Sequence, residues 1–544
     1  MLLLTSFDDL SQSLFDQLQG RHHLGLQAAD ASEPLLHTIT RFQPQLLINL
    51  SPQRLDMNTR QAVPCIRLIR HWHTLAPLSA LNHTDSAIEH AYVSLVHDSA
   101  QDEAPILLQR PLVTPDHWQE EAGQLLQQWL QQQSSDSPRL GPWQAQANTI
   151  AVTTEPSSPI DWQQEPSLRI IQRINRADPR QGQLATVAGV SLHLFDAKPE
   201  YKLRHPQAGQ LLAQRHGAVC ISTQDGALWL RIARASRTID QQFFNLPTAL
   251  VLADKMRRVA PLLTPEPAEL SDVNMVDLRF EQRDEIGYLY FDFAGGMMDA
   301  DQAHRLLAAY HHACEQPVKV IVLMGGPKHW CHGFDLHRIE ASNDPATESW
   351  RAANAFNDVV EAILTTEDKI TVAALTGNAS AGGLMLALAC DYAVAREGIL
   401  LNPHFNHLGL SGSAYWTYSL PKRVGTTMAK QLTESGLPIN APQALQLQLL
   451  DQCFANAHFT EQLQQYCLAI RHNNLMAQLH NKWRNRRKEE ELKPLAKYRA
   501  EELVKMRREF ASDSPYHALR HAMVYQTPWQ TLPNYLQAFA IKPE

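Results

Sequence analysis

Two short stretches, WCHGFDL at residues 330–336 and TGNASAGG at residues 376–383, decide the fold of this chain. Each follows an apolar run with the length of a buried strand, 318–324 and 370–375, and the second leads into an apolar helical pattern at 384–389. A strand-to-helix turn leaves backbone N–H groups without partners, and glycine lets a ligand approach the backbone closely. We therefore expect each turn to aim one N–H into a shared pocket that stabilises an oxyanion.

As a pair, the two turns resemble the crotonase (enoyl-CoA hydratase/isomerase) superfamily, whose members stabilise the oxyanion of an acyl thioester. The stretch CDYA at 390–393 continues the resemblance as the next strand. The resemblance implies Phe334 and Gly382 as the two N–H donors, with Gly333 and Gly383 in the coenzyme A-binding turns. Either turn alone would also fit an ordinary α/β connection with a packing glycine.

The bulk composition excludes several classes of protein. The 544 residues are 44% hydrophobic and 19% charged, which predicts a folded protein of about two to four domains. Net charge is −8, and the basic runs at 482–488 and 505–508 are interleaved with acids, so no nucleic-acid partner is expected. The seven cysteines form no CxxC pair, which predicts reduced thiols in a cytoplasmic protein and no metal site.

The chain shows no targeting or membrane signal. Its first residues, MLLLTSFDD, lack the basic region of a signal peptide. No apolar run approaches the ~20 residues of a membrane span. We therefore expect no membrane partner.

The sequence predicts a multidomain α/β protein of four segments. Residues 1–135 alternate apolar runs with helical patterns, as in an open, largely parallel sheet. Residues 155–262 contain short strands and a hairpin turn at 224–226, which predicts a small β-barrel. Residues 275–475 hold the two glycine turns, and 476–544 form a charged, amphipathic helical tail. In crotonases such a tail covers the acyl pocket or mediates subunit contacts, and both roles stay open.

This order of segments resembles the HypX/HoxX family of NiFe-hydrogenase maturation factors, which join a formyltransferase module to a crotonase module. The matching stretches fall between residues 159 and 520. They include INRAD at 174–178, LFDAKPE at 194–200, LMGGP at 323–327, LNPH at 401–404, YWTY at 415–418 and KPLAKYR at 493–499.

The resemblance implies a reaction in two steps. The N-terminal module would move a formyl group from formyl-tetrahydrofolate to coenzyme A, and the crotonase module would decarbonylate formyl-CoA to carbon monoxide for the hydrogenase iron. The implied cofactors are coenzyme A and formyl-tetrahydrofolate without a metal, and Arg176 belongs to the implied cofactor-binding residues. The implied partners are an acyl-CoA and the hydrogenase maturation machinery.

The crotonase-like site departs from the expected patterns. Hydratases place two glutamates where this chain has Met385 and His404, and methionine can neither activate water nor protonate carbon, so simple hydration is excluded. HypX proteins place a tyrosine and a glutamate where this chain has Phe405 and Ala414. His404 would also fit a structural role with its ring hydrogen-bonded. The remaining candidate proton relays are His404, Tyr415 and Ser413.

The N-terminal segment departs from the formyltransferase pattern as well. Formyltransferases use an asparagine, a histidine in a His-Pro turn and an aspartate in Asp-x-Gly. Here the corresponding region reads CIRLIRHWH at 65–73, and Ala104 replaces the glycine that should follow Asp102. His71 and Asp102 are the candidates for polarising a formamide. A degenerate formyltransferase-like scaffold without activity fits the same residues.

Three functions stay open. The first is HypX-like formyl transfer and carbon monoxide release. The second is a crotonase-type acyl-CoA enzyme with another substrate, since Phe405 and Ala414 make the pocket roomier and more apolar. The third is a non-catalytic scaffold that binds coenzyme A or a protein partner.

Overall fold

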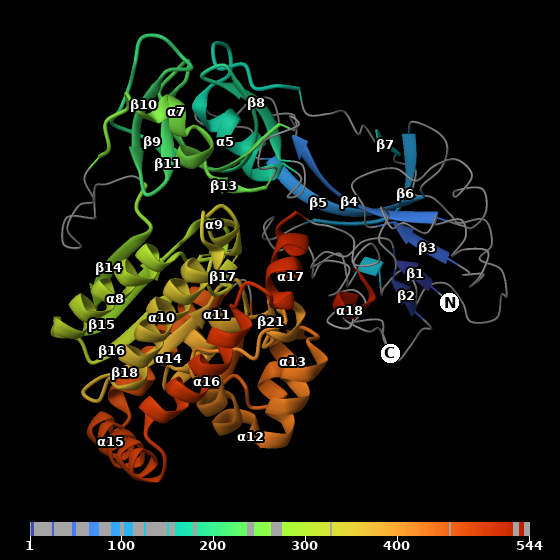
Figure 1. The fold of residues 1–544 in the computed structure, drawn as a ribbon. Helices are drawn as coiled ribbons and strands as arrows, with labels where there is room; N and C mark the ends of the chain where they lie inside the picture. The colour runs from blue at the N-terminus through green and yellow to red at the C-terminus, as the bar shows by residue number, and fades with distance from the viewer. Residues whose placement is uncertain are drawn as a thin grey trace.

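The structure is a computed structural model that describes most of the chain beyond residue 158 and separate strands before it (Figure 1). Before residue 158, side chains are described only at Leu47, Ile48, Leu125 and Leu126. The described ranges are 2–4, 24–26, 46–49, 65–74, 89–97, 103–111, 125–126, 149–151, 158–177, 182–236, 244–262, 275–326, 329–455, 458–525 and 533–537.

The N-terminal segment contains a seven-stranded sheet. Its strands are β1 (Leu2–Leu4), β2 (Leu24–Leu26), β3 (Leu46–Asn49), β4 (Cys65–Thr74), β5 (Glu89–His97), β6 (Glu103–Pro111) and β7 (Thr149–Ala151). The order is β2-β1-β3-β4-β5-β6-β7. The pairs from β2 to β4 are parallel and those from β4 to β7 are antiparallel, so the sheet is mixed. The expected helix at 10–18 lies outside the described residues.

The second segment is a β-rich unit with one helix, α5 (Ser167–Arg176). Its main sheet follows the order β10-β11-β12-β9-β8, and β13 pairs with β12. The hairpin expected around 224–226 is confirmed, because β11 and β12 pair antiparallel across it. The strands are β8 (Gln183–Val187), β9 (Val190–Glu200), β10 (Leu211–Arg215), β11 (Ala218–Ser222), β12 (Ala227–Ala235) and β13 (Leu246–Pro247). Short helices α6 (Thr248–Val251) and α7 (Ala253–Met256) follow.

The third segment is built on two sheets. The larger has the order β14-β15-β16-β18-β20-β23, and all its pairs except β14–β15 are parallel. Its strands are β14 (Leu278–Arg283), β15 (Ile286–Phe291), β16 (Val320–Met324), β18 (Ile370–Leu375), β20 (Tyr392–Arg396) and β23 (Gln452–Phe454). The smaller consists of β17 (His329–Cys331), β19 (Asn378–Ser380), β21 (Leu400–Asn402) and β22 (Ile439–Asn440).

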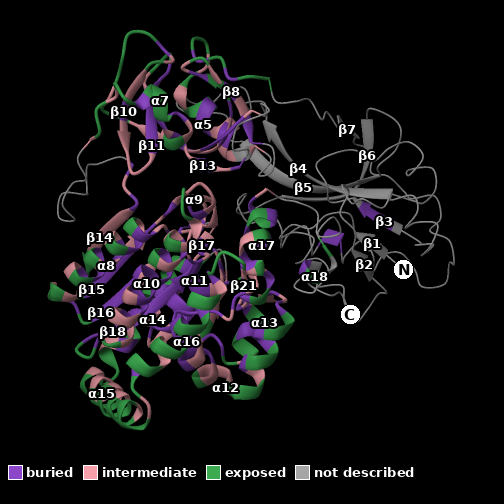
Figure 2. Cartoon of the chain, viewed as in Figure 1, coloured by how far each residue is buried: buried purple, intermediate pink, exposed green. Residues whose placement is uncertain are grey.

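Helices cover both faces of the larger sheet (Figures 1 and 2). Ile321 and Leu323 of β16 belong to the core beneath the helices on one face, while Val320 and Val322 pack with the helix at 459–472 on the other. Burial on both faces explains why β16 and β18 are apolar throughout. The helices are α8 (Ala300–Glu315), α9 (Leu336–Glu340), α10 (Pro345–Leu364), α11 (Ala381–Leu388), α12 (Trp416–Ser435), α13 (Ala441–Gln446) and α14 (Phe459–His472).

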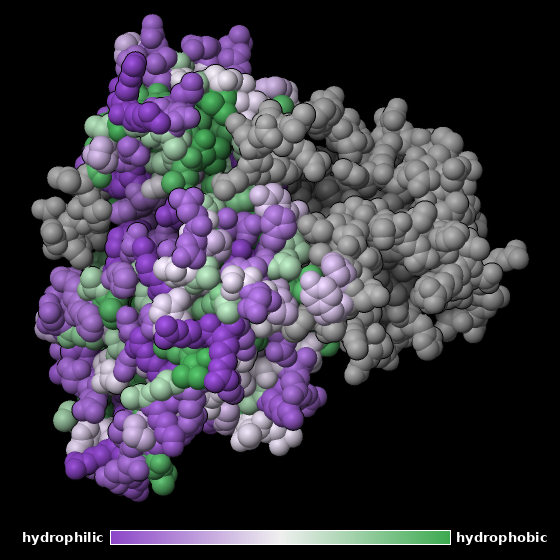
Figure 3. Space-filling model, viewed as in Figure 1, coloured by the Kyte–Doolittle hydropathy of each residue, from purple (hydrophilic) through white to green (hydrophobic). Residues whose placement is uncertain are grey.

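The tail is helical, as the sequence predicts. It comprises α15 (Leu475–Leu492), α16 (Leu495–Glu509), α17 (Pro515–Val524) and α18 (Asn534–Gln537). Helix α16 is amphipathic and buries Leu503 and Met506, whereas α15 buries none of its side chains. The surface in view over the described residues is mainly hydrophilic, with small apolar patches (Figure 3). No described helix combines the length and the apolar character that crossing a membrane requires.

A buried arginine joins the second segment to the third. Arg231 of β12 is 4% exposed and pairs with Asp196 of β9 at 2.9 Å. It also reaches Asp292 at 3.4 Å and Asp277 at 3.8 Å, which flank β15 and β14. Burial lowers the pKa of Arg231, but the three carboxylates outweigh burial and raise it above its ordinary value. A cation with this many partners fixes the two segments against each other.

A carboxylate from α16 caps the start of α12. Tyr415, the residue before α12, has a left-handed φ of 58°, and its own side chain makes no capping bond. The Glu502 carboxylate instead accepts the N–H of Tyr415 and the N–H of Thr417, both at 2.9 Å. Burial raises the pKa of Glu502 to about 7, although hydrogen bonds from Thr417 and Tyr415 lower it. The tail thereby holds the loop that leads into α12.

We predict that Arg231→Ala destabilises the protein by about 3 kcal/mol, because it leaves the buried Asp277 and the half-buried Asp196 and Asp292 without their shared cation. Urea denaturation followed by circular dichroism measures the loss. The matched control is Arg257→Ala, whose pair with Asp254 is exposed at 81% and 89% and should contribute little. Equal losses in both variants would contradict a stabilising role for the buried network.

The Glu502 carboxyl predicts a pH dependence of stability. Because its folded pKa lies near 7, above the ordinary 4.5, its contribution is complete below about pH 4.5 and is lost as pH rises through 7. The full effect is on the order of 3 kcal/mol. Glu502→Gln should therefore flatten the fall in unfolding free energy between pH 5 and 8. The exposed neighbour Glu501→Gln should keep the wild-type slope, and a wild-type slope in Glu502→Gln would refute the assignment.

Candidate functional site

The structure brings the two glycine turns side by side. Strand β17 pairs in parallel with β19, with Cys331 opposite Ala379. The turns that follow are therefore neighbours. A Cβ built on Gly333 would lie 3.5 Å from the Gly382 nitrogen. Gly333 has a φ of 85°, a conformation that favours glycine.

Both expected donor N–H groups are free of the regular hydrogen-bond ladders. The Met298 N–H donates to the Gly333 carbonyl at 2.9 Å, and the Asp335 N–H donates to the Met298 carbonyl at 2.8 Å. These two bonds use the Gly333 carbonyl and the Asp335 N–H, on either side of Phe334. The Phe334 N–H therefore points to the side of the strand opposite Met298. Gly382 is the second residue of α11, so its N–H has no acceptor within the helix.

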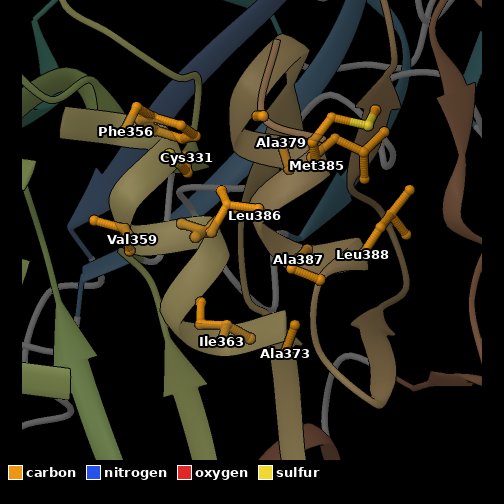
Figure 4. Packing of buried hydrophobic residues seen from close by; sticks show 14 of the residues in the cluster. Cys331, Phe356, Val359, Ile363, Ala373, Ala379, Met385, Leu386, Ala387 and Leu388 are labelled. Atoms are coloured by element: carbon orange, nitrogen blue, oxygen red, sulfur yellow. The ribbon is translucent and has the colours of Figure 1, made fainter. Parts of the chain in front are cut away.

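Close packing between the turns explains the second glycine of the pair. A Cβ on Gly383 would lie 2.1 Å from the Cys331 carbonyl oxygen, a distance no side chain tolerates. Apolar residues hold α11 in place from behind, including Phe356 of α10 (Figure 4). Met385 is part of this core and fully buried, so the position of the first hydratase glutamate carries no acid here.

His404 lies just beyond β21 with a buried, unpartnered ring nitrogen. Its Nδ1 makes no hydrogen bond to any described residue. The His407 ring lies 4.8 Å away between centroids. Burial, with a smaller contribution from His407, lowers the pKa of His404 to about 3, so the imidazole is neutral at physiological pH.

Tyr415 is fully buried, and its hydroxyl lies near Glu361 and Arg499. Within the described part of the chain the hydroxyl has no hydrogen-bond partner. Burial raises the pKa of Tyr415 above its usual value, and the Glu361 carboxylate raises it further. The phenol is therefore protonated at neutral pH. Ser413, two residues before Tyr415, is also buried.

A hydrogen-bonded chain at the turns was missed by the sequence analysis. Ser380 Oγ lies 2.7 Å from His332 Nδ1, and His332 Nε2 lies 2.8 Å from His329 Nδ1. Burial, with smaller contributions from nearby His329 and His404, lowers the pKa of His332 to about 3. A signal was available, because His332 and Ser380 each precede an expected donor, Phe334 or Gly382, by two residues.

The structure describes the remaining candidate residues, His71, Asp102 and Arg176, only in part or not at all. His71 is in the middle of β4, with its backbone opposite Tyr92 of β5. It is thus in a strand and not in the His-Pro turn of formyltransferases. Asp102 and the side chains of His71 and Arg176 lie outside the described residues, so their roles stay predictions. Among the described side chains, no cluster of three or more histidines, cysteines or acids could hold a metal ion.

Two family models match the chain. An enoyl-CoA hydratase/isomerase model matches residues 298–514, and a formyl transferase C-terminal domain model matches residues 154–245. The chain is 34% identical over 378 residues to the hydrogenase maturation factor HoxX of Bradyrhizobium diazoefficiens. That alignment covers 69% of this chain and 65% of HoxX, slightly less than two thirds of the relative.

Solved structures of HypX from Aquifex aeolicus match almost the whole chain. A variant of that protein gives a TM-score of 0.84 at 29% identity, covering 99% of this chain and 98% of the other. The same protein in complex with tetrahydrofolic acid gives a TM-score of 0.83 with the same identity and coverage. The matches extend over the N-terminal sheet, the β-rich segment and the crotonase-like segment in one order. By sequence and by fold, the chain belongs to the HoxX/HypX-like proteins, with a formyl transferase C-terminal domain and an enoyl-CoA hydratase/isomerase domain.

Proposed function

We propose that this chain serves hydrogenase maturation by making carbon monoxide from a formyl group carried on coenzyme A. The observation that carries the proposal is the adjacency of the Gly333–Phe334 and Gly382–Gly383 turns, with one N–H of each available to a ligand. Two such donors suit the carbonyl oxygen of a thioester, on which negative charge develops during reaction. The HoxX and HypX relatives connect this pocket with hydrogenase maturation.

The N-terminal module would supply the formyl group from formyl-tetrahydrofolate. The proposal is supported by the fold match to HypX, which was solved in complex with tetrahydrofolic acid. His71 and Asp102 are the proposed polarising residues, and Arg176 is a proposed binding residue. Coenzyme A would accept the formyl group as a thioester and carry it to the crotonase-like domain.

Release of carbon monoxide from formyl-CoA breaks the C–H and C–S bonds of the formyl group and forms one S–H bond. A nearby group must therefore take the formyl proton and return one to sulfur. Among the proposed relays, His404 is neutral and has a free buried Nδ1, which suits a proton acceptor. Tyr415 is the weaker candidate because its hydroxyl lies beside Glu361 and Arg499.

A second function, an acyl-CoA enzyme for another substrate, is favoured by the residues around Phe405. This ring is buried, and it packs so closely on Gly412 that a Cβ there would lie 2.4 Å from it. An apolar wall at this position is compatible with acyl groups other than formyl. Coenzyme A titration by calorimetry separates both enzymes from a scaffold that no longer binds coenzyme A.

We predict carbon monoxide production when the purified protein receives formyl-tetrahydrofolate and coenzyme A, with reduced haemoglobin as the trap. Gly382→Asp should lower the rate by roughly 100-fold or more, because its side chain obstructs an oxyanion donor. The control is Gly226→Asp, in the distant hairpin turn, which should keep the wild-type rate. Coenzyme A binding without any carbon monoxide would refute the proposal and favour the second function.

A further inference from the structure

The hydrogen-bonded chain at the turns has the connectivity of a nucleophilic triad. Ser380 Oγ lies 2.7 Å from His332 Nδ1, and the tautomer of His332 decides which of the two donates. In the tautomer with the His332 proton on Nε2, Ser380 donates to Nδ1, and Nε2–H donates to His329 Nδ1 at 2.8 Å. This is the order of a nucleophile, a base and an orienting group.

The serine is placed at the start of α11, yet it does not cap the helix. Ser380 is the N-cap residue, a position where a serine hydroxyl usually accepts a backbone N–H. Its side chain makes no such bond and pairs with His332 instead. The helix therefore gains no capping bond from this hydroxyl, which is half-buried and directed to the imidazole.

The nucleophile and the base both sit directly beside the oxyanion donors. Gly382 follows Ser380 by two residues, and Phe334 follows His332 by two residues. Serine hydrolases likewise take an oxyanion donor from within two residues of the nucleophile. Because β17 and β19 are paired neighbours, the serine hydroxyl belongs to the same pair of segments as both N–H donors.

We propose that Ser380 is a nucleophile that takes the acyl group of a coenzyme A thioester and passes it to water. His332 acts as its base, and His329 positions His332. The inference shares the coenzyme A thioester pocket with the proposed function but requires neither folate nor carbon monoxide. It assigns the pocket a thioester hydrolase activity.

The reaction balances with water as the only co-reactant. Ser380 Oγ bonds to the carbonyl carbon while its proton moves to His332 Nδ1. The C–S bond then breaks, and His332 returns the proton to the sulfur, which leaves as the free thiol of coenzyme A. Water attacks the acyl-serine, giving up a proton through His332, and the products are a carboxylic acid and the regenerated serine.

Acetyl-CoA is the probe that tests this activity. We expect the wild-type protein to release free coenzyme A, measured with a thiol reagent, and we expect acetylated Ser380 in the rapidly quenched protein by peptide mass spectrometry. Ser380→Ala should lower the rate at least about 100-fold and abolish the label. The exposed serine variant Ser512→Ala should behave as wild type.

Two further variants separate positioning from structural damage. His329→Ala should lower kcat with little change in KM, because the thioester pocket itself is unaltered. His329→Gln should restore part of kcat, since its amide oxygen can still accept the His332 Nε2–H. A raised KM together with impaired folding in both variants would instead assign His329 a merely structural role. That result would overturn its part in the proposal.

The outcome is independent of the carbon monoxide assay. Acetylation at Ser380 without carbon monoxide would support the hydrolase and refute the proposed function. Carbon monoxide production without acetyl-CoA hydrolysis or label would overturn the nucleophile and leave the proposed function standing. Hydrolysis that persists in Ser380→Ala would also overturn it, because the activity would then not use this hydroxyl.

Discussion

The parallel pairing of β17 with β19 is the constraint on which the candidate site depends. It forces the Cys331 carbonyl against the Gly383 backbone, where a methyl group would lie 2.1 Å from the oxygen. Only glycine permits this approach, which brings Gly333 next to the Gly382 nitrogen. The packing of α10 and α11 behind the turns keeps the geometry from relaxing.

The chemistry of the site depends on neutral, buried groups. Burial holds the imidazoles of His332 and His404 neutral, so both can accept protons without first losing one. With so low a pKa, each imidazole is a weak base. Proton transfer to it requires strong stabilisation of the negative charge that develops on the substrate. The Phe334 and Gly382 N–H groups are the proposed source of this stabilisation, which would offset the weak basicity of the histidines.

The other segments act on this site through a few polar contacts. Arg231 ties the β-rich segment to the strands that lead into the crotonase-like core. Glu502 of the tail holds the left-handed backbone at Tyr415 and the start of α12. The tail therefore holds the loop that leads into α12.

The sequence by itself determined the local features: apolar strands at 318–324 and 370–375, the hairpin at 224–226, the glycine turns and the order of domains. Such features follow from periodicity and glycine placement within short windows. Only the tertiary structure decided which polar groups meet, because those contacts join residues far apart in the chain. Ser380 meets His332 across β17 and β19, and the Tyr415 hydroxyl lies near Glu361 and Arg499.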